Sequence, residues 1–389
     1  MSKYATAETT HSPPSSPVRL HTAVQRFSMI PIGFLCLFLI LRYADAVISH
    51  MKLGLSLCAK TVIPSLFPFM VISELLVCSG GGELLGNIFQ KPFQRLFGIS
   101  GGGVCALLMG WICGFPIGAK TAVSLCKRGV ITSEELSDLI CYCNIPSSAF
   151  LINAVGVSLF GNRRFGLILY MIGILTSLIT ALILHRIHPR PAPVQPLIRM
   201  GTSAPGTLIQ SITSAATAML YVCAYILFFT ALSGALGELL RHHQIGQSAI
   251  AMIFGFFELS GGIMQASSLS NPIVARQLTA LLCGWSGLSV HLQILSLCAT
   301  LPEEKRIRSA PYLICKVLQS IFCVIFSELV FRLLPSAQPI SSMQTSSPVI
   351  SPSPFVCIAC FISFAMLCLV GGTVKKHYTP KKSVPLRED

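Results

Sequence analysis

Charge is what this sequence has least of. Asp, Glu, Lys and Arg make up only 11% of its 389 residues, whereas hydrophobic residues make up 53%. Soluble domains carry roughly 25% charged residues, so a chain of this composition cannot cover its apolar surface in water. The composition therefore predicts an all-α, polytopic integral membrane protein whose solvent is the lipid bilayer.

Charged residues are absent from whole blocks of the sequence rather than being evenly rare along it. Residues 96–119, 139–162 and 165–184 contain no Asp, Glu, Lys, Arg or His. Each block reaches about 20 residues, the length that a helix needs to cross a bilayer. Similar apolar runs occupy residues 27–41, 211–237, 277–290 and 355–374. By this length rule we expect about eight to ten membrane segments.

Other absences exclude other classes of protein. The chain has 28 Lys and Arg against 14 Asp and Glu, but it has no basic stripe interleaved with aromatic residues, so we expect no nucleic-acid partner. It lacks the HExxH, GxSxG, P-loop and GxGxxG motifs, so we expect no enzyme activity and no cofactor. Its 16 cysteines are scattered singly through apolar runs, which predicts neither a metal site nor disulfides.

The two ends of the chain look like additions to a central core. Residues 1–26 are rich in Ser, Thr and Pro and predict a disordered cytoplasmic N-terminus. The basic residues before the next apolar run predict a signal-anchor transmembrane helix over residues 27–49. Beyond the core we expect a Pro/Ser-rich linker at 335–354, a C-terminal transmembrane helix at 355–374 and a basic tail at 375–389.

The core itself contains a weak internal repeat. LLMGWICGFPIGAK at 107–120 is echoed by MIFGFFELSGGIMQ at 252–265, and LSDLICYCNIPSS at 136–148 by LTALLCGWSGLSV at 278–290. Between the two echoes, each half has a polar helix start: Thr132 and Glu135 have capping-box spacing, and Asn271 precedes Pro272. Chance likeness between two hydrophobic stretches is the alternative.

We therefore predict two structurally related halves of the kind found in duplicated transporters. The first repeat is expected at residues 50–190 and the second at 211–334, with a linker at 191–210 between them. An odd number of spans in each half would give inverted repeats and an even number parallel ones. We expect inverted repeats with re-entrant elements.

Glycine and proline interrupt the apolar runs at corresponding places in the two halves. GFPIG at 114–118 and NIPSS at 144–148 are expected to unwind their helices, and such breaks survive in a membrane only where protein, water or a ligand satisfies the backbone. Paired breaks are the best sequence indication of a transport site. The candidate substrate-binding residues are Gly114, Pro116, Gly118, Lys120, Asn144, Ser147, Ser286, Ser289 and His291.

Four of the candidates are ionisable residues in apolar surroundings. An ammonium at Lys120, beside half-helix N-termini, would suit an anion; the alternative is a lysine that reaches the lipid headgroups. Glu74 and Glu258 are candidates to carry a coupling proton or sodium ion. His291 is a candidate to sense protonation or bind substrate. For each of these three, the alternative is a structural hydrogen bond.

Several stretches resemble a known family. PSLFPFMVISELL, GFPIGAKTAVSLCKRGVIT, CNIPSSAFLINAVG and GWSGLSVHLQ are similar to the YlbJ-like sporulation integral membrane proteins. These contain nucleoside-recognition or Gate domains and look similar to parts of concentrative nucleoside transporters and spore maturation proteins. The family's Pro-Gly-Lys motif falls on Pro116, Gly118 and Lys120, and its Trp-Ser-Gly and His fall on Trp285, Ser286, Gly287 and His291. The chain departs from the family pattern in its Pro/Ser linker, its extra C-terminal span and its Ile145-Pro146 pair.

The resemblance implies a helical transporter fold with broken or re-entrant helices and a role in endospore formation. It further implies movement of dipicolinic acid for the spore cortex and core, at the mother-cell-derived outer forespore membrane. Three functions stay open at this point. The protein could transport a small anionic solute, act as a membrane scaffold that assembles a spore-envelope complex with other sporulation membrane proteins, or transport nucleosides.

Overall fold

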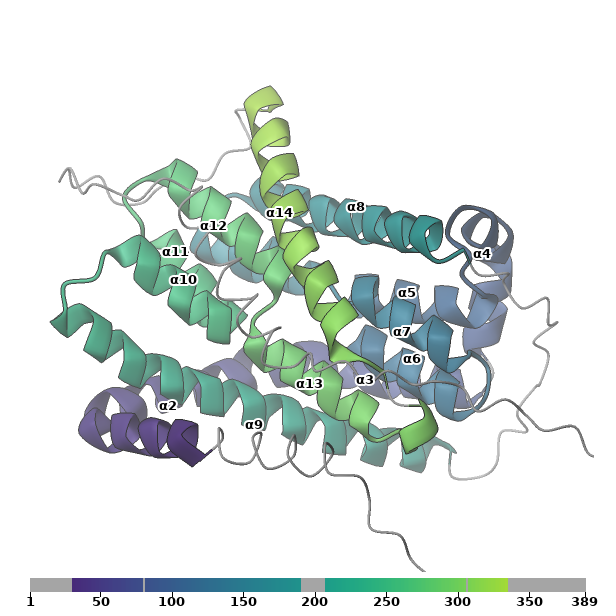
Figure 1. Ribbon diagram of the computed structural model, residues 1–389, viewed down its shortest axis with the longest axis horizontal. Helices are drawn as coiled ribbons and strands as arrows, with labels where there is room; N and C mark the ends of the chain where they lie inside the picture. Colours follow the sequence, from purple (N-terminus) through teal and green to yellow (C-terminus); the bar gives the residue numbers. More distant parts are fainter. Residues whose placement is uncertain (1–29, 80, 190–206, 306, 335–389) are drawn as a thin grey trace, which may run out of the picture.

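The computed structural model describes residues 30–79, 81–189, 207–305 and 307–334, and these residues form helices and connecting turns without any strand (Figure 1). The expected N-terminal segment 1–26 and the linker, last span and basic tail at 335–389 lie outside the described residues. So does most of the linker expected at 191–210, whose last residues, 207–210, begin the longest helix.

Short helices dominate the first half of the chain. A helix over Ile30–Arg42 precedes the labelled elements. These are α2 (Ala44–Leu57), a π-helical turn (Cys58–Val62), α3 (Ile63–Cys78), α4 (Gly81–Phe97), α5 (Gly101–Cys113), α6 (Ile117–Lys127), α7 (Ser133–Tyr142), a π-helical segment (Phe150–Leu159) and the long α8 (Arg163–Ile187).

The second half begins with the longest helix and ends with another long one. Its elements are α9 (Thr207–His242), α10 (Gln247–Phe257), α11 (Leu259–Ser267), α12 (Pro272–Trp285), α13 (Leu288–Ala299), a short 3₁₀ turn (Glu303–Lys305) and α14 (Ser309–Leu333).

Four stretches of helix are long and apolar enough to cross a membrane, and up to six spans result if each of two bent helix pairs counts as one. The four are Arg163–Ile187, Leu208–His242, Pro272–Ala299 and Glu303–Leu333. The bent pairs, at 95° and 94°, are Ile30–Arg42 with Ala44–Lys60, and Phe89–Phe97 with Gly101–Cys113. These findings confirm a polytopic, all-α membrane protein. The described residues hold fewer full spans than eight to ten because several apolar runs fold as pairs of short helices.

Both predicted helix breaks of the first half are present. The chain leaves helical geometry after α5 and again after α7, and it does so in the second half at Glu258 and at Ser286–Gly287. The expected caps are also confirmed. Thr132 accepts a hydrogen bond from the N–H of Glu135 at 3.1 Å, and Asn271 caps α12 ahead of Pro272. Each half therefore contains two helix–break–helix units in the same order.

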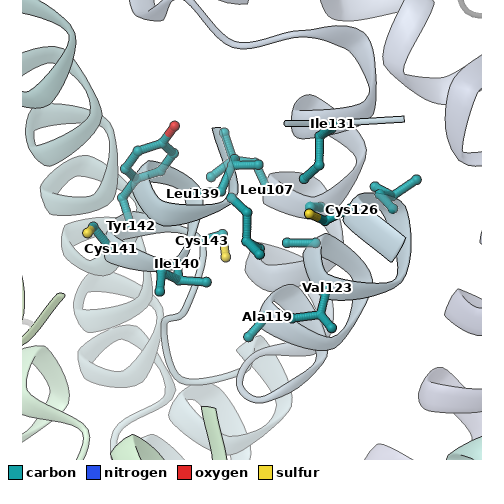
Figure 2. Close-up of a cluster of buried hydrophobic side chains, with 14 of the residues drawn as sticks. Leu107, Ala119, Val123, Cys126, Ile131, Leu139, Ile140, Cys141, Tyr142 and Cys143 are labelled. Atoms are coloured by element: carbon teal, nitrogen blue, oxygen red, sulfur yellow. The ribbon is translucent and has the colours of Figure 1, made fainter. Parts of the chain in front are cut away.

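Packing ties the two halves together. α9 lies along α2 and α3, while α14 crosses α12 and packs on α8 and α7 (Figure 1). Leu107 of α5, Ala119 and Val123 of α6 and Leu139 of α7 belong to one buried apolar cluster (Figure 2). A second cluster joins the π-helical segment and α8 to α10, α11 and α12. Residues beside the breaks belong to these cores, Cys143 to the first and Leu259 and Trp285 to the second, so packing holds the breaks in place.

Candidate functional site

The two breaks of the first half cross in direct backbone contact. Gly114 has φ +80°, and a Cβ there would lie 2.5 Å from the backbone nitrogen of Ser147, so only glycine fits this crossing. The N–H of Phe115 donates to the carbonyl of Ile145 at 3.0 Å. This bond satisfies part of the unwound backbone that the membrane interior could not satisfy.

The second half repeats the crossing with its own glycine. Gly287, φ +87°, follows α12, and a Cβ there would lie 3.0 Å from the backbone nitrogen of Leu259. Leu259 is the first residue of α11. The first turns of α11 and α13 therefore start side by side, which brings two positive helix ends together.

A cavity of about 470 Å³ lies where the breaks of both halves meet. The first half contributes Phe115, Ser147, Phe150 and Asn153 to its wall, and the second half contributes Val222, Ile226, Glu258, Ser260, Ser289 and Gln293. Its volume falls in the range of about 300–1,000 Å³ that small-molecule sites occupy. A smaller cavity, of about 280 Å³, lies between α7 and α8 and contains none of the predicted site residues.

Lys60 and Glu258 are the ionisable side chains among the described residues of the large cavity's wall. Glu258 is only 7% exposed. Its carboxylate caps α11, accepting hydrogen bonds from the N–H groups of Ser260 at 3.0 Å and Gly261 at 2.7 Å. By contrast, the N-terminus of α13, where Ser289 and Val290 face the cavity, has no capping side chain. The cavity thus offers an ammonium, a buried carboxylate and an uncapped helix N-terminus.

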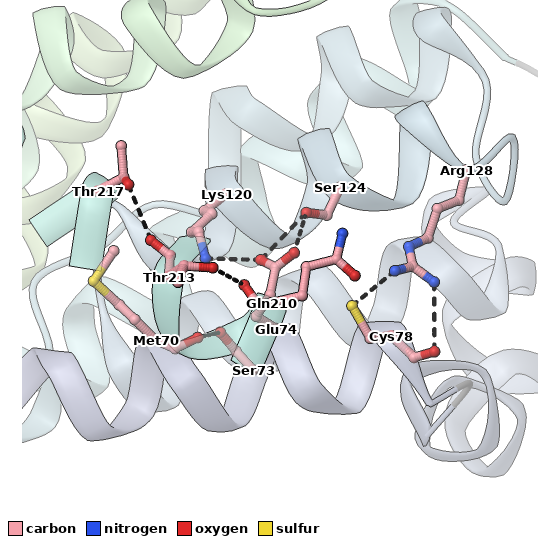
Figure 3. Close-up of polar contacts among 10 residues, drawn as sticks. All are labelled: Met70, Ser73, Glu74, Cys78, Lys120, Ser124, Arg128, Gln210, Thr213 and Thr217. Atoms are coloured by element: carbon pink, nitrogen blue, oxygen red, sulfur yellow. Dashed lines mark hydrogen bonds and ion pairs between the residues drawn. The ribbon is translucent and has the colours of Figure 1, made fainter. Parts of the chain in front are cut away.

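Lys120 and Glu74, predicted separately, form an ion pair (Figure 3). The ammonium of Lys120 on α6 lies 2.7 Å from a carboxylate oxygen of Glu74 on α3, and the two side chains are 7% and 12% exposed. The hydroxyl of Ser124 donates to the same carboxylate. Neither Lys120 nor Glu74 is among the residues that line the large cavity. The ion pair joins α3 to α6 outside the cavity wall.

Three further candidates build the first-half break itself. Asn144 is fully buried; its amide oxygen accepts from the N–H of Ala119 at 3.1 Å and its amide nitrogen donates to the carbonyl of Ile140 at 3.1 Å. Pro116 is the N-cap residue of α6, and Gly118 packs against the carbonyl of Cys143. Asn144 therefore fastens the start of α6 to the end of α7, and its role as a ligand stays a prediction.

His291 is fully buried among aromatic rings. Its Nδ1 lies 2.8 Å from the hydroxyl of Tyr312, and its ring packs edge-on against Trp285 with centroids 4.3 Å apart. His291 Nε2 and the hydroxyl of Ser286 have no hydrogen-bond partner within the described part of the chain. Neither residue lines the cavity, so the wall holds Ser147, Ser289 and Glu258 among the predicted site residues.

Sequence reasoning missed several polar residues of this region. Gln293 donates to the hydroxyl of Ser289 at 3.1 Å, four residues earlier on α13, and both face the cavity. The i,i+4 spacing is the signal that could have found it. Two buried cations were also missed: Arg276, paired with Glu328 at 2.6 Å, and Lys316. Their position in long apolar stretches was the available signal.

Comparison with known proteins identifies a relative of this chain. No family model matches it, and no solved structure matches it. It is similar to the sporulation integral membrane protein YlbJ of Bacillus subtilis (strain 168), with 26% identity over 341 residues that cover 77% of this chain and 81% of that protein. This relationship supports a membrane role in sporulation and agrees with the helical membrane architecture. The similarity supports a YlbJ-like assignment for this chain.

Proposed function

We propose that the protein is a transporter that moves a small anionic solute across a membrane of the sporulating cell, with the large cavity as its binding site. The observation that carries this proposal is the meeting of two pairs of broken helices at one cavity. Broken helices placed this way bind the substrate in many membrane transporters. The relative's printed role in sporulation narrows the setting.

A compact dicarboxylate such as dipicolinic acid suits this cavity. One carboxylate can accept hydrogen bonds at the uncapped N-terminus of α13, beside Ser289 and Gln293. The other can pair with the ammonium of Lys60 in the same wall. The aromatic body would lie against Phe115 and Phe150, which also line the cavity.

Glu258 gives the proposal a coupling step. An ionised carboxylate in the cavity wall repels an anionic solute, whereas a protonated one can donate a hydrogen bond to it. The solute would therefore enter together with a proton on Glu258. Sodium is the competing coupling ion, and the mother-cell-derived outer forespore membrane is the proposed location.

Flux measurements test the function. Purified protein in liposomes should move dipicolinate when a pH gradient is imposed, and Ser147→Leu or Ser289→Leu should abolish the flux by filling the cavity. Ser270→Leu is the matched control, since Ser270 is exposed and lies outside the cavity wall. Flux that survives both cavity substitutions would refute the site.

The same purified protein in liposomes distinguishes anion transport from the nucleoside and scaffold alternatives. Transport of nucleosides instead of dipicolinate would support the nucleoside alternative. Folded protein that moves neither solute under any gradient, yet co-purifies with another sporulation membrane protein, would support the scaffold alternative.

A further inference from the structure

Lys316 is a buried cation without a carboxylate partner in the described residues. It lies two turns into α14 and is only 1% exposed. Its ammonium donates to the backbone carbonyl of Asn144 and, at 2.9 Å, to the side-chain oxygen of Gln319. Both acceptors are neutral oxygens. Because a buried charge is costly unless it is paired or well coordinated, this arrangement calls for an explanation.

The oxygens around Lys316 are held in place by other contacts. Asn144 stands in the break that follows α7, one residue past the C-cap Cys143, so its carbonyl lies next to the negative end of that helix. The amide nitrogen of Gln319 donates to the carbonyl of Cys141 at 2.9 Å and to the hydroxyl of Thr180 at 3.3 Å. These two bonds turn the amide oxygen of Gln319 toward the ammonium. The ammonium therefore occupies a formed oxygen site rather than a chance gap.

Unwound backbone carbonyls at the C-terminal ends of half-helices are the groups that coordinate cations in transporters with broken helices. The titratable side chains close to the ammonium are the imidazole of His291 and the thiols of Cys141, Cys143, Cys315 and Cys323. None of these is a carboxylate, so the charge that balances Lys316 comes from carbonyl and amide dipoles.

We propose that Lys316 is a tethered cation that fills a monovalent-cation site at the C-terminal end of α7. Its ammonium takes the place that a bound alkali ion would otherwise occupy. Because Asn144 also caps α6 through the N–H of Ala119, this one charge holds both breaks of the first half to α14. The inference concerns the stability of the break and does not depend on which solute is transported.

Removing the ammonium should open this site to a cation from solution. In Lys316→Ala the deleted side chain leaves room, so the melting temperature should rise saturably with ammonium or sodium chloride and stay flat with choline chloride at equal ionic strength. The wild-type protein should not respond, because its site is filled. Lys316→Met, which fills the space without charge, should be less stable than wild type and equally unresponsive.

A folded Lys316→Ala variant that responds alike to all three salts would overturn the proposal. If that variant does not fold in any salt, Lys316→Gln decides the matter, because glutamine keeps N–H donors but carries no charge. A melting temperature clearly below that of wild type would then support the tethered cation. Equal melting temperatures would show that the charge is dispensable and the proposal wrong.

Discussion

Glu74 and Lys120 face each other across the α3–α6 contact, with 2.7 Å between a carboxylate oxygen and the ammonium. They lie 46 residues apart in the chain. The same two helices are joined a little further along by Arg128, whose guanidinium contacts the sulfur and the carbonyl of Cys78 (Figure 3). The ion pair therefore fixes α3 against the helix that begins at the first break.

Removal of one partner from this pair should be more harmful than removal of both. Lys120→Met leaves a buried carboxylate without its cation, and such a loss typically costs about 3–5 kcal/mol. The double variant Glu74→Gln, Lys120→Met should recover much of this stability because no uncompensated charge remains. Unfolding in detergent measures both effects.

Flux in the same variants separates a structural role from a ligand role. If Lys120 also binds the solute, the double variant will be stable but inactive. If the pair is only structural, the double variant will recover transport together with stability. A double variant no more stable than Lys120→Met would show that the two charges are not coupled.

The parts of this site that sequence predicted were local ones. Gly114 and Pro116 indicated a break because glycine and proline disfavour continued helix, and the caps at Thr132 and Asn271 have short-range signatures. The structure contains each of these features. Such signals need only a few neighbouring residues, so no knowledge of the fold is required to find them.

Long-range pairing was beyond the sequence. The residues around Lys120 do not indicate that it pairs with Glu74. Nor do those around Lys316 indicate that it donates to the carbonyl of Asn144, 172 residues earlier. The number of full spans was also hard to predict, since an apolar run such as residues 96–119 fits one span by length. In the structure this run contains α5, the second helix of the bent pair Phe89–Phe97 with Gly101–Cys113, and then the break before α6. An apolar run has the same hydropathy whether it is buried in lipid or in protein. Hydropathy alone therefore does not distinguish a full span from a pair of short helices packed inside the protein.

Glu258→Gln should make dipicolinate flux independent of an imposed pH gradient. The glutamine side chain keeps an oxygen that can accept from the N–H of Gly261, so the loss of stability should stay below about 1 kcal/mol. It carries no titratable proton, so dipicolinate flux should no longer follow an imposed pH gradient. Glu258→Ala is the stability control, since losing the cap should cost about 0.5–2 kcal/mol. Unchanged pH dependence in Glu258→Gln would assign the coupling to another group.

Gly114→Ala should damage the crossing of the two first-half breaks. Gly114 has φ +80° and ψ −174°, a backbone region that essentially only glycine adopts, so the new methyl group would combine strain of about 1–3 kcal/mol with a clash 2.5 Å from the backbone of Ser147. Gly129→Ala is the matched control: Gly129 has φ +73°, but a Cβ added there would meet nothing within 4 Å. The difference in melting temperature between the two variants measures the clash together with the extra backbone strain of Gly114. Similar losses in both would mean that the crossing can relax.

Lys60 offers the sharpest test of the charge of the solute. Its side chain is exposed in the cavity wall, so Lys60→Gln should leave stability nearly unchanged. A partly solvated ion pair is worth up to about 1 kcal/mol, which corresponds to about a fivefold rise in the dipicolinate concentration that gives half-maximal flux. Lys52→Gln is the control, because Lys52 is an exposed lysine on α2 outside the cavity wall. An uncharged solute would not distinguish the two variants, so equal half-saturation concentrations would argue against an anion bound at Lys60.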